Sequence, residues 1–262
     1  LRDRPLDSHK GTFGRVGVIA GSSGYTGAAY LTSQGAQRAG AGLVTLAVPK
    51  SLQAIMAGKV TEVMTYALED DGEGHFSADA AKVAVEFLYD KDAAALGPGM
   101  GTSRELLEFI RYILGKIDIP IVIDADGLNN LSKDIGIIKD YGYPVVLTPH
   151  PGEMARLTGR PIKTILDDPI KNAQELSFET GAVVLLKGAT TVVTDPEGRV
   201  YINQTGNSGM ATGGSGHVLT GIIASLTAQG YDAFNAAVLG SFVHGRAGDI
   251  AARGLGKTGM IA

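Results

Sequence analysis

Residues 15–27 read RVGVIAGSSGYTG, an apolar run that passes directly into a glycine-rich loop. The run predicts a buried β-strand over residues 15–20, and the small residues that follow predict a helix over residues 28–39. A strand, a glycine-rich loop and a helix in this order form the repeating unit of α/β proteins. The start of the chain therefore favours a sheet that is covered by helices.

The same order recurs along the chain. Further strands are predicted by the apolar runs at residues 43–48, 61–66, 93–96, 119–123, 145–147 and 183–186, and helices by residues 78–88, 104–114, 173–179, 215–228 and 233–252. Residues 191–194 and 199–202 flank the turn sequence DPEG and predict a hairpin. We therefore expect an α/β fold of three layers (α/β/α), with a mostly parallel central sheet, a β-hairpin near its edge and a single domain over residues 1–262.

Composition narrows the class of function. The formal net charge is -4 and no basic stretch stands out, which disfavours nucleic acid as a partner. The chain has no cysteine, which excludes disulfides and thiolate metal sites and suits a cytoplasmic protein. No apolar run approaches the roughly 18–20 residues that span a bilayer, so no membrane partner is expected. GxSxG and HExxH motifs do not occur, which disfavours a hydrolase triad and a zinc protease.

Glycine-rich or polar segments follow the predicted strands: GSSGYTG, GPGMG, DADG, TPHPGE and KGATT. In parallel sheets, ligands bind beyond the carboxyl ends of the strands, where such loops meet. The chain also contains 37 glycines, and they gather in these loops without a period. This distribution predicts an active site that binds phosphate at one edge of the sheet.

The loop GMATGGSG, which precedes the predicted helix at 215–228, is the most informative motif. Glycines let the backbone amides turn inward, and a helix N-terminus adds unpaired N–H groups. Both favour an anion, although a loop that only turns into the helix is the alternative. The motif lacks the GK[ST] of a Walker A loop and the Rossmann spacing. The candidate nucleotide-binding residues here are Gly213, Gly214, Ser215 and Gly216.

Three other groups of polar residues are candidates. Lys187 ends a predicted strand and is placed to bind a phosphate or adenylate group, with Thr190 and Thr191 as donors; a solvated strand end is the alternative. His150 lies between two prolines and three residues before Glu153, so the pair is either a ligand or Mg²⁺ site or the start of a helix with a capping Glu. Asp124 and Asp126 in DADG either hold Mg²⁺ or cap a helix.

These motifs together resemble the ADP-dependent (S)-NAD(P)H-hydrate dehydratase family, whose fold is ribokinase-like. The matching stretches follow the family order: HKGTFGRVGVIAGSSGYTGAA, AGAGLVTLAVP, ALGPGMG, VIDADGLNNL, VLTPHPGEMARL, LLKGATTVV, NSGMATGGSGHVLTGIIA and AAVLGSFVHGRAGDIAA. The resemblance implies repair of hydrated NADH or NADPH (NADHX or NADPHX) with ADP, or ATP, as co-substrate. The ring hydroxyl would be phosphorylated and phosphate then lost, which gives NAD(P)H, AMP and phosphate, with Mg²⁺ expected.

The resemblance also implies roles for individual residues and for partners. The AMP part would be contacted by Lys187, Gly188, Ala189, Thr190, Thr191 and Gly216, and the hydrate site would be lined by Ala41, Gly101, His150, Asn207 and His217. Glu153 is the candidate metal ligand. Family members are commonly homotetramers, and fusion or association with an NAD(P)HX epimerase is a further expectation.

One position departs from the family pattern, because His217 stands where the family has the Asp of GSGD. That Asp is the expected base for the attacking hydroxyl. A neutral His can accept a proton near pH 7 but lacks the negative charge. Three interpretations of His217 remain open: a working natural variant, a weakened or inactive enzyme, and a deliberate substitution. Two other functions also remain: a small-alcohol or vitamin-precursor kinase of the same fold, and a nucleotide-binding sensor without turnover.

Overall fold

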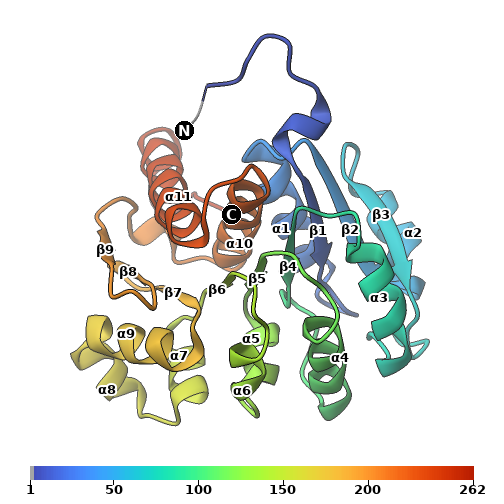
Figure 1. Ribbon diagram of the computed structural model, residues 1–262. Helices are drawn as coiled ribbons and strands as arrows, with labels where there is room; N and C mark the ends of the chain where they lie inside the picture. Colours follow the sequence, from blue (N-terminus) through green and yellow to red (C-terminus); the bar gives the residue numbers. More distant parts are fainter. Residues whose placement is uncertain (1–2) are drawn as a thin grey trace.

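The computed structural model describes residues 3–262. In this part of the chain nine strands form one sheet: β1 (Arg15–Ile19), β2 (Leu43–Pro49), β3 (Met64–Leu68), β4 (Ala93–Leu96), β5 (Ile121–Ile123), β6 (Val145–Leu147), β7 (Val183–Leu186), β8 (Thr191–Thr194) and β9 (Val200–Asn203). Their order in the sheet is β3-β2-β1-β4-β5-β6-β7-β8-β9 (Figure 1).

The sheet is parallel from β3 to β7, and β8 and β9 continue it in antiparallel pairing. This confirms the mostly parallel sheet and the hairpin at its edge. The predicted strand at residues 61–66 was placed too early, because β3 begins at Met64. β3 is an edge strand and pairs only with β2. It begins where this pairing begins, at Met64 opposite Thr45, and the apolar pattern of its own sequence does not mark that point.

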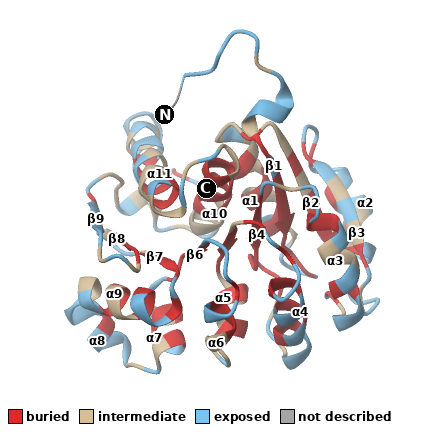
Figure 2. Cartoon of the chain, viewed as in Figure 1, coloured by how far each residue is buried: buried red, intermediate tan, exposed pale blue. Residues whose placement is uncertain are grey.

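Helices cover both faces of the sheet, as predicted (Figures 1 and 2). One face carries α1 (Thr26–Arg38), α2 (Gln53–Ala57), α10 (Ser215–Ala228) and α11 (Ala233–Leu255). The other carries α3 (Ala81–Leu88), α4 (Arg104–Leu114), α5 (Asp126–Leu131), α6 (Gly136–Lys139), α7 (Pro151–Thr158), α8 (Ile162–Asp167) and α9 (Pro169–Thr180). The sequence did not predict the short helices α2, α6 and α8, because too few turns are present to show a helical period. It offered α5 only as the helix that an Asp of DADG would cap.

Two hydrophobic cores lie between these layers. Successive residues of a strand point to opposite faces, so Val16 and Val18 of β1 join one core and Ile19 joins the other. Both sides of the central strands are buried, and β4 is buried at all four positions. This explains why the strands read as continuous apolar runs rather than as alternating patterns.

Close packing of α1 against α10 sets the position of the α10 N-terminus. A Cβ atom on Gly221 would lie 2.0 Å from the Thr32 carbonyl oxygen, and one on Gly35 would lie 2.5 Å from the Val218 carbonyl oxygen. The two backbones therefore meet directly, which only glycine allows. This contact fixes α10 over the sheet, with its first turn at the carboxyl ends of the parallel strands.

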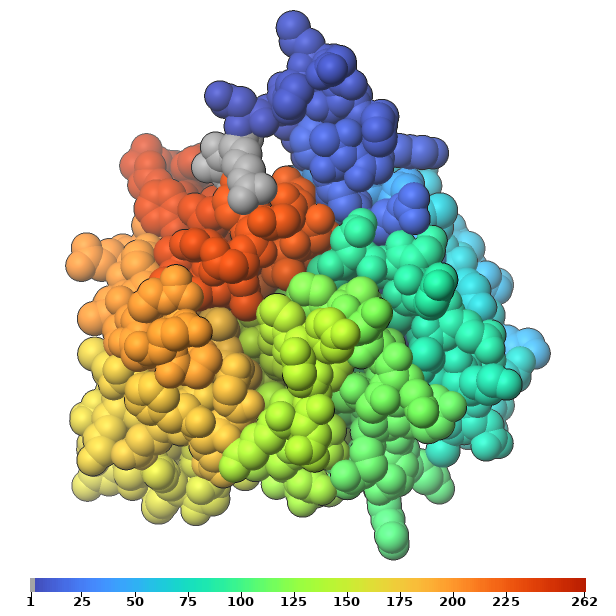
Figure 3. All heavy atoms as spheres, in the orientation of Figure 1, coloured from blue at the N-terminus to red at the C-terminus, as the bar shows by residue number. Residues whose placement is uncertain are grey.

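The N-terminal segment stands out from the body of the molecule, as the space-filling view shows in blue (Figure 3). Its Arg4 guanidinium lies over the Phe13 ring, 3.9 Å from the ring centroid. None of the helices in the described part of the chain combines the length and the apolar character that a bilayer crossing demands.

Candidate active site

The loops after the parallel strands meet at one edge of the sheet, as predicted. Backbone hydrogen bonds join them in pairs: Gly21 N–H donates to the Pro98 carbonyl at 2.8 Å, and Lys187 N–H donates to the Pro149 carbonyl at 2.8 Å. Between these two contacts, Gly101 N–H donates to Asp126 Oδ2 at 3.0 Å. The loops GSSGYTG, GPGMG, DADG, TPHPGE and KGATT therefore form one continuous edge.

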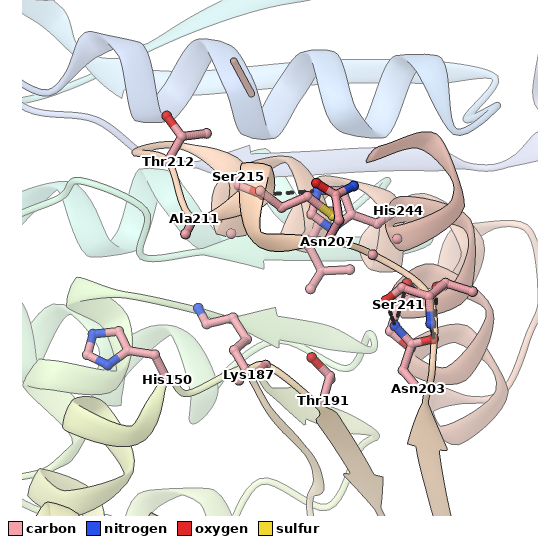
Figure 4. Close-up of a pocket in the computed structure, with 18 of the residues that line it drawn as sticks. His150, Lys187, Thr191, Asn203, Asn207, Ala211, Thr212, Ser215, Ser241 and His244 are labelled. Atoms are coloured by element: carbon pink, nitrogen blue, oxygen red, sulfur yellow. Dashed lines mark hydrogen bonds between the residues drawn. The ribbon is translucent and has the colours of Figure 1, made fainter. Parts of the chain in front are cut away.

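A cavity of about 840 Å³ opens at this edge, between the β5–β7 loops and the first turn of α10. Figure 4 shows His150 and Lys187 on one wall, with Asn207, Ser215 and His244 across from them. This volume is in the range of small-molecule sites. The lining residues are Ala125, His150, Pro151, Glu153, Lys187, Gly188, Ala189, Thr191, Asn203, Thr205, Gly206, Asn207, Ser208, Met210, Ala211, Thr212, Ser215, Gly216, His217, Leu219, Ser241, His244 and Gly245.

Lys187 is the charged centre of the cavity wall rather than a solvated strand end. Its Nζ lies 2.6 Å from Asp124 Oδ1 and 3.8 Å from Glu153 Oε2. Burial alone would lower the pKa of Lys187, but the charges of Asp124 and Glu153 outweigh it and raise that pKa. Lys187 is therefore a fixed cation at the wall of the cavity, suited to an anionic ligand.

Asp124 is the buried partner of this cation. Its side chain is 0% exposed, and Thr148 Oγ1 donates to Oδ1 at 2.9 Å. Burial alone would raise the pKa of Asp124, but the charge of Lys187 and the hydrogen bond from His217 hold that pKa well below its usual range. Asp124 is therefore ionised and paired with Lys187, and the hypothesis that it holds Mg²⁺ stays a prediction. Asp126, the other candidate, starts α5 and accepts hydrogen bonds from Gly101 and Asn129.

The TPHPGE segment has the geometry of a helix cap. His150 Nδ1 accepts hydrogen bonds from the N–H of Gly152 at 2.9 Å and of Glu153 at 3.4 Å, while His150 N–H donates to Glu153 Oε2 at 2.8 Å. This reciprocal capping box starts α7, which was the alternative interpretation of the motif. His150 also lines the cavity, so its predicted place at a ligand site stays open.

Glu153 does not fit the role of a resident metal ligand. Its carboxylate accepts the His150 N–H and faces the Lys187 ammonium, which would repel a cation. Within residues 3–262, no three His, Asp or Glu side chains are grouped so that they could hold a metal ion. Residues 3–262 therefore supply no group of three such ligands for Mg²⁺, and an ion here would need further ligands from a bound nucleotide.

The glycine loop brings part of its predicted residues to the cavity. Ser215 and Gly216 line it, whereas Gly213, Gly214 and Thr190 are not among its lining residues. Gly214 has φ 95°, and a Cβ there would lie 2.3 Å from Leu31 Cδ1 of α1, so this glycine turns the chain into α10. A Cβ on Gly216 would lie 3.3 Å from Lys187 Nζ, so this glycine leaves the ammonium open to the cavity.

His217 lies beside the same charges. Its Nδ1 is 3.3 Å from Asp124 Oδ2, and its side chain is 26% exposed at the cavity wall. The site thus brings together residues that are far apart in the sequence: Asp124 directly after β5, Glu153 in α7, Lys187 directly after β7 and His217 in α10. The prediction placed Lys187 and His217 in one site, and the structure brings them together there.

Two predicted hydrate-site residues lie elsewhere. Ala41 precedes β2 and is 5% exposed in the core between the sheet and α1, at the amino end of the strand. Ala41 therefore does not line the described cavity, and its assignment to the hydrate site stays a prediction. Gly101 follows β4 at the correct edge and is held by Asp126 and Asn130, but it does not line the cavity.

The far wall of the cavity contains residues that the sequence did not single out. His244 of α11 has its Nε2 3.4 Å from Ser215 Oγ, and burial lowers the pKa of His244 to about 4. Asn203, Thr205 and Ser241 surround the same end. The sequence of α11 shows a histidine and small residues within an apolar helix. An ordinary core helix has the same pattern, so the sequence offered no reason to place these residues in the site.

The loop from Asn203 to Thr212 is fixed by an acidic residue of α11. Asp249 Oδ2 accepts a hydrogen bond from Gly206 N–H at 3.1 Å, and Asp249 Oδ1 accepts one from Asn207 Nδ2 at 3.2 Å. Asn207 Oδ1 in turn accepts one from Gly209 N–H at 2.9 Å. Asn207, a predicted substrate residue, therefore lines the cavity and also shapes its loop.

One lining residue is strained. Ala125 has φ 52° and ψ -117°, the single non-glycine residue with positive φ among those described. It separates Asp124, which faces Lys187, from Asp126, which faces Gly101. Such strain costs about 1–3 kcal/mol and gathers at functional sites.

Comparisons with known proteins point to one family. A sequence profile described as NAD(P)H-hydrate dehydratase matches residues 16–261. The bifunctional NAD(P)H-hydrate repair enzyme Nnr of Moorella thermoacetica is 48% identical over 262 residues, which make up 100% of this chain and 49% of that protein. The ADP-dependent (S)-NAD(P)H-hydrate dehydratase of Neisseria meningitidis serogroup B is 37% identical, with 100% of this chain and 86% of that protein covered.

Structure comparison agrees with this. The crystal structure of an ADP/ATP-dependent NAD(P)H-hydrate dehydratase from Bacillus subtilis, co-crystallized with ATP/Mg²⁺, superposes with a TM-score of 0.86 at 28% identity. The match covers 100% of this chain and 89% of that one. The chain spans about half the length of the bifunctional relatives that it matches.

Proposed function

Because this chain belongs to the NAD(P)H-hydrate dehydratase family, we propose that it uses ADP, or ATP, to dehydrate the S form of hydrated NADH or NADPH (NADHX or NADPHX). The products with ADP are NAD(P)H, AMP and phosphate. The reaction class is that of a carbon–oxygen lyase, and its use is the repair of the nicotinamide cofactor. A matched relative of similar length carries this activity in its name, which supports the proposal.

The observation that carries the proposal is the position of Lys187 under the first turn of α10. The Lys187 ammonium faces the cavity beneath Gly216, where a side chain would otherwise come within 3.3 Å of it. The N–H groups of a helix N-terminus and a cation at one point favour a phosphate group. We place the nucleotide phosphates there and the rest of the nucleotide along the KGATT segment, Ser215 and the wall that contains His244.

The residues of the chain then have distinct tasks in the proposed reaction. Lys187 and the α10 amides hold the phosphates, and His217 at the edge of this group accepts the proton of the ring hydroxyl as its oxygen attacks the terminal phosphorus. The new O–P bond forms while the bond between that phosphorus and the leaving nucleotide oxygen breaks. Phosphate then leaves with the C–O electrons, and the neighbouring carbon of the nicotinamide ring releases a proton to water, which gives the reduced nicotinamide.

Mg²⁺ enters this proposal only with the nucleotide. It would neutralise charge on the transferred group when bound to the phosphates. Asp124 and Glu153 are already engaged by Lys187, so we assign no step to a metal that the protein holds by itself. Magnesium dependence is therefore expected to follow nucleotide concentration rather than to reflect a resident ion.

An absorbance assay tests the function directly. Purified protein with hydrated NADH and Mg²⁺ receives ADP in one series and ATP in the other. Recovery of the reduced-nicotinamide absorption band with release of phosphate is the expected result, and the more effective nucleotide is the donor. A stable phosphoester of the substrate would instead identify a kinase, and nucleotide binding without either product would identify a disabled or sensory member.

The setting of the enzyme is also part of the proposal. We expect a homotetramer, action in the cytoplasm, where the reduced cofactors are used, and fusion or association with an NAD(P)HX epimerase. The bifunctional names of several relatives support the last expectation. Sedimentation of the purified chain tests the homotetramer, and co-purification with an epimerase tests the association.

A further inference from the structure

We infer that Asp124 is a positioning residue for His217: it holds the imidazole in the tautomer whose Nε2 is free to take the proton of the substrate hydroxyl. The inference rests on the proposed function, since it concerns the base of that reaction. It explains how a histidine serves at a position where the family pattern has a carboxylate. The sequence suggested only two roles for Asp124, as a metal ligand or as a helix cap, and the family match assigns it none.

The hydrogen bonds of Asp124 divide between its two oxygens. Oδ1 accepts hydrogen bonds from Lys187 Nζ at 2.6 Å and from Thr148 Oγ1 at 2.9 Å. Oδ2 faces His217 Nδ1 at 3.3 Å. Because the carboxyl group is fully buried and Lys187 keeps it ionised, both oxygens can only accept hydrogen bonds.

This arrangement decides the tautomer of His217. A nitrogen that faces an acceptor-only carboxylate must carry the proton, so Nδ1 is the donor and Nε2 has the lone pair. Nε2 has no protein partner among the residues that the structure describes, and the ring lies at the cavity wall. The same division of roles operates in Asp–His pairs of other enzymes, where the carboxylate orients the ring and the far nitrogen accepts the proton.

The proton of the substrate hydroxyl is accounted for within this site. When the substrate oxygen attacks phosphorus, its O–H bond breaks and the proton moves to Nε2, which gives an imidazolium ring. Asp124, still ionised, then faces a cation through the same Nδ1–H hydrogen bond. The ring returns to its starting state when it gives the proton to the departing phosphate.

The variant Asp124→Asn should reverse the tautomer. Lys187 and Thr148 both donate, so they select the amide oxygen of Asn for the side that Oδ1 now occupies. The amide NH₂ would then face His217 Nδ1, which would have to accept. The proton would move to Nε2, and the base would be lost although the shape of the site is retained.

The first experiment reads the tautomer without any turnover. The protein has 5 histidines, so ¹⁵N-histidine labelling gives few imidazole signals, and His217→Gln identifies those of His217 by their loss. In the unaltered chain we expect a protonated Nδ1 and an unprotonated Nε2, and in Asp124→Asn the reverse. An unprotonated Nδ1 in the unaltered chain would overturn the inference, whether or not the protein turns over hydrated NADH.

The second experiment separates positioning from structural support of Lys187. Asp124→Asn is made in the unaltered chain and in a His217→Asp chain, and kcat is measured at saturating ADP. In the unaltered chain we expect a loss of about 100-fold or more, the usual contribution of a general base. In the His217→Asp chain the loss should be less than about 10-fold, because a carboxylate base needs no tautomer to be fixed.

Equal losses in both chains would mean that Asp124 only anchors Lys187, and the inference would fail. The matched control is the exposed pair in which His75 Nδ1 lies 3.0 Å from Asp71 Oδ2, outside the cavity. Asp71→Asn should leave kcat unchanged. If every chain lacks turnover but the tautomers are as expected, the proposed function fails while the Asp124–His217 arrangement stands.

Discussion

Acid should destabilise this protein through His244, a histidine that the cavity wall keeps neutral. Burial lowers the pKa of His244 from 6.5 to about 4. In the unfolded chain the ring takes up a proton as the pH falls below 6.5, whereas in the folded chain it does so only near pH 4. The unfolded state therefore binds more protons in this window, and the free energy of unfolding decreases as the pH falls through it.

The size of the effect follows from the two pKa values. A pKa difference of about 2.5 lowers the free energy of unfolding by about 3 kcal/mol once the pH is below both pKa values. At about pH 5 the loss is about 2 kcal/mol. Water in the cavity makes these figures upper limits, because the ring borders the ligand space. The variant His244→Gln has no titrating ring and should lack this contribution at every pH.

Urea unfolding of the nucleotide-free chain and of His244→Gln, at a series of pH values between about 7.5 and 5, measures the effect. The carboxylates contribute equally to both proteins, so the difference between the two free energies isolates His244. As the pH falls, the unaltered chain should lose up to about 2 kcal/mol more free energy of unfolding than His244→Gln loses. Parallel curves for the two proteins would refute the claim that His244 is held neutral in the folded state.

Three further changes test the site. Lys187→Met should lower the free energy of unfolding by about 3–5 kcal/mol, because it leaves the fully buried Asp124 unpaired, and should weaken ADP binding in a calorimetric titration; an unchanged ADP affinity would remove Lys187 from the phosphate site. Ala125→Gly should raise the free energy of unfolding by about 1 kcal/mol in urea, because relief of positive-φ strain exceeds the added entropy of the unfolded chain; a loss of stability would contradict this. His217→Asp should raise kcat in the absorbance assay and leave ADP affinity nearly the same, since it supplies the negative charge that the family resemblance predicts at this position; an unchanged rate would contradict the assignment of the base to this position.

The fold was predictable because its signals are local. Strands β1, β4, β6 and β7 are largely apolar runs with a glycine or proline within the next two residues, and the helix Ser215–Ala228 was predicted to the residue. Its start is marked by glycines and most of its body is apolar or small, so no distant contact was needed to define it. The start of β3 was misplaced for the opposite reason, since the register of its neighbour decides it.

The site was predictable only in part, because its chemistry depends on contacts over long stretches of chain. Lys187 was recognised as a candidate, but its pairing with Asp124, 63 residues away, cannot be inferred from either segment. Ala41 shows a different limit: the resemblance gave it a role, but it precedes β2 and does not line the described cavity, so that role stays a prediction. The polar wall around His244 carried no distinct motif at all.

The contacts of Asp124 explain how the site can work with a histidine at position 217 in place of a carboxylate. A carboxylate base accepts a proton on either oxygen and needs no partner to define it, whereas an imidazole needs one nitrogen fixed before the other can act. Asp124 provides that partner, and it is held in place independently of position 217 by Lys187 and Thr148 on its other oxygen. The exchange therefore requires no second substitution: the carboxylate that serves Lys187 also orients the new base. For the same reason Asp124 should tolerate replacement less well in this chain than in relatives that have Asp at position 217.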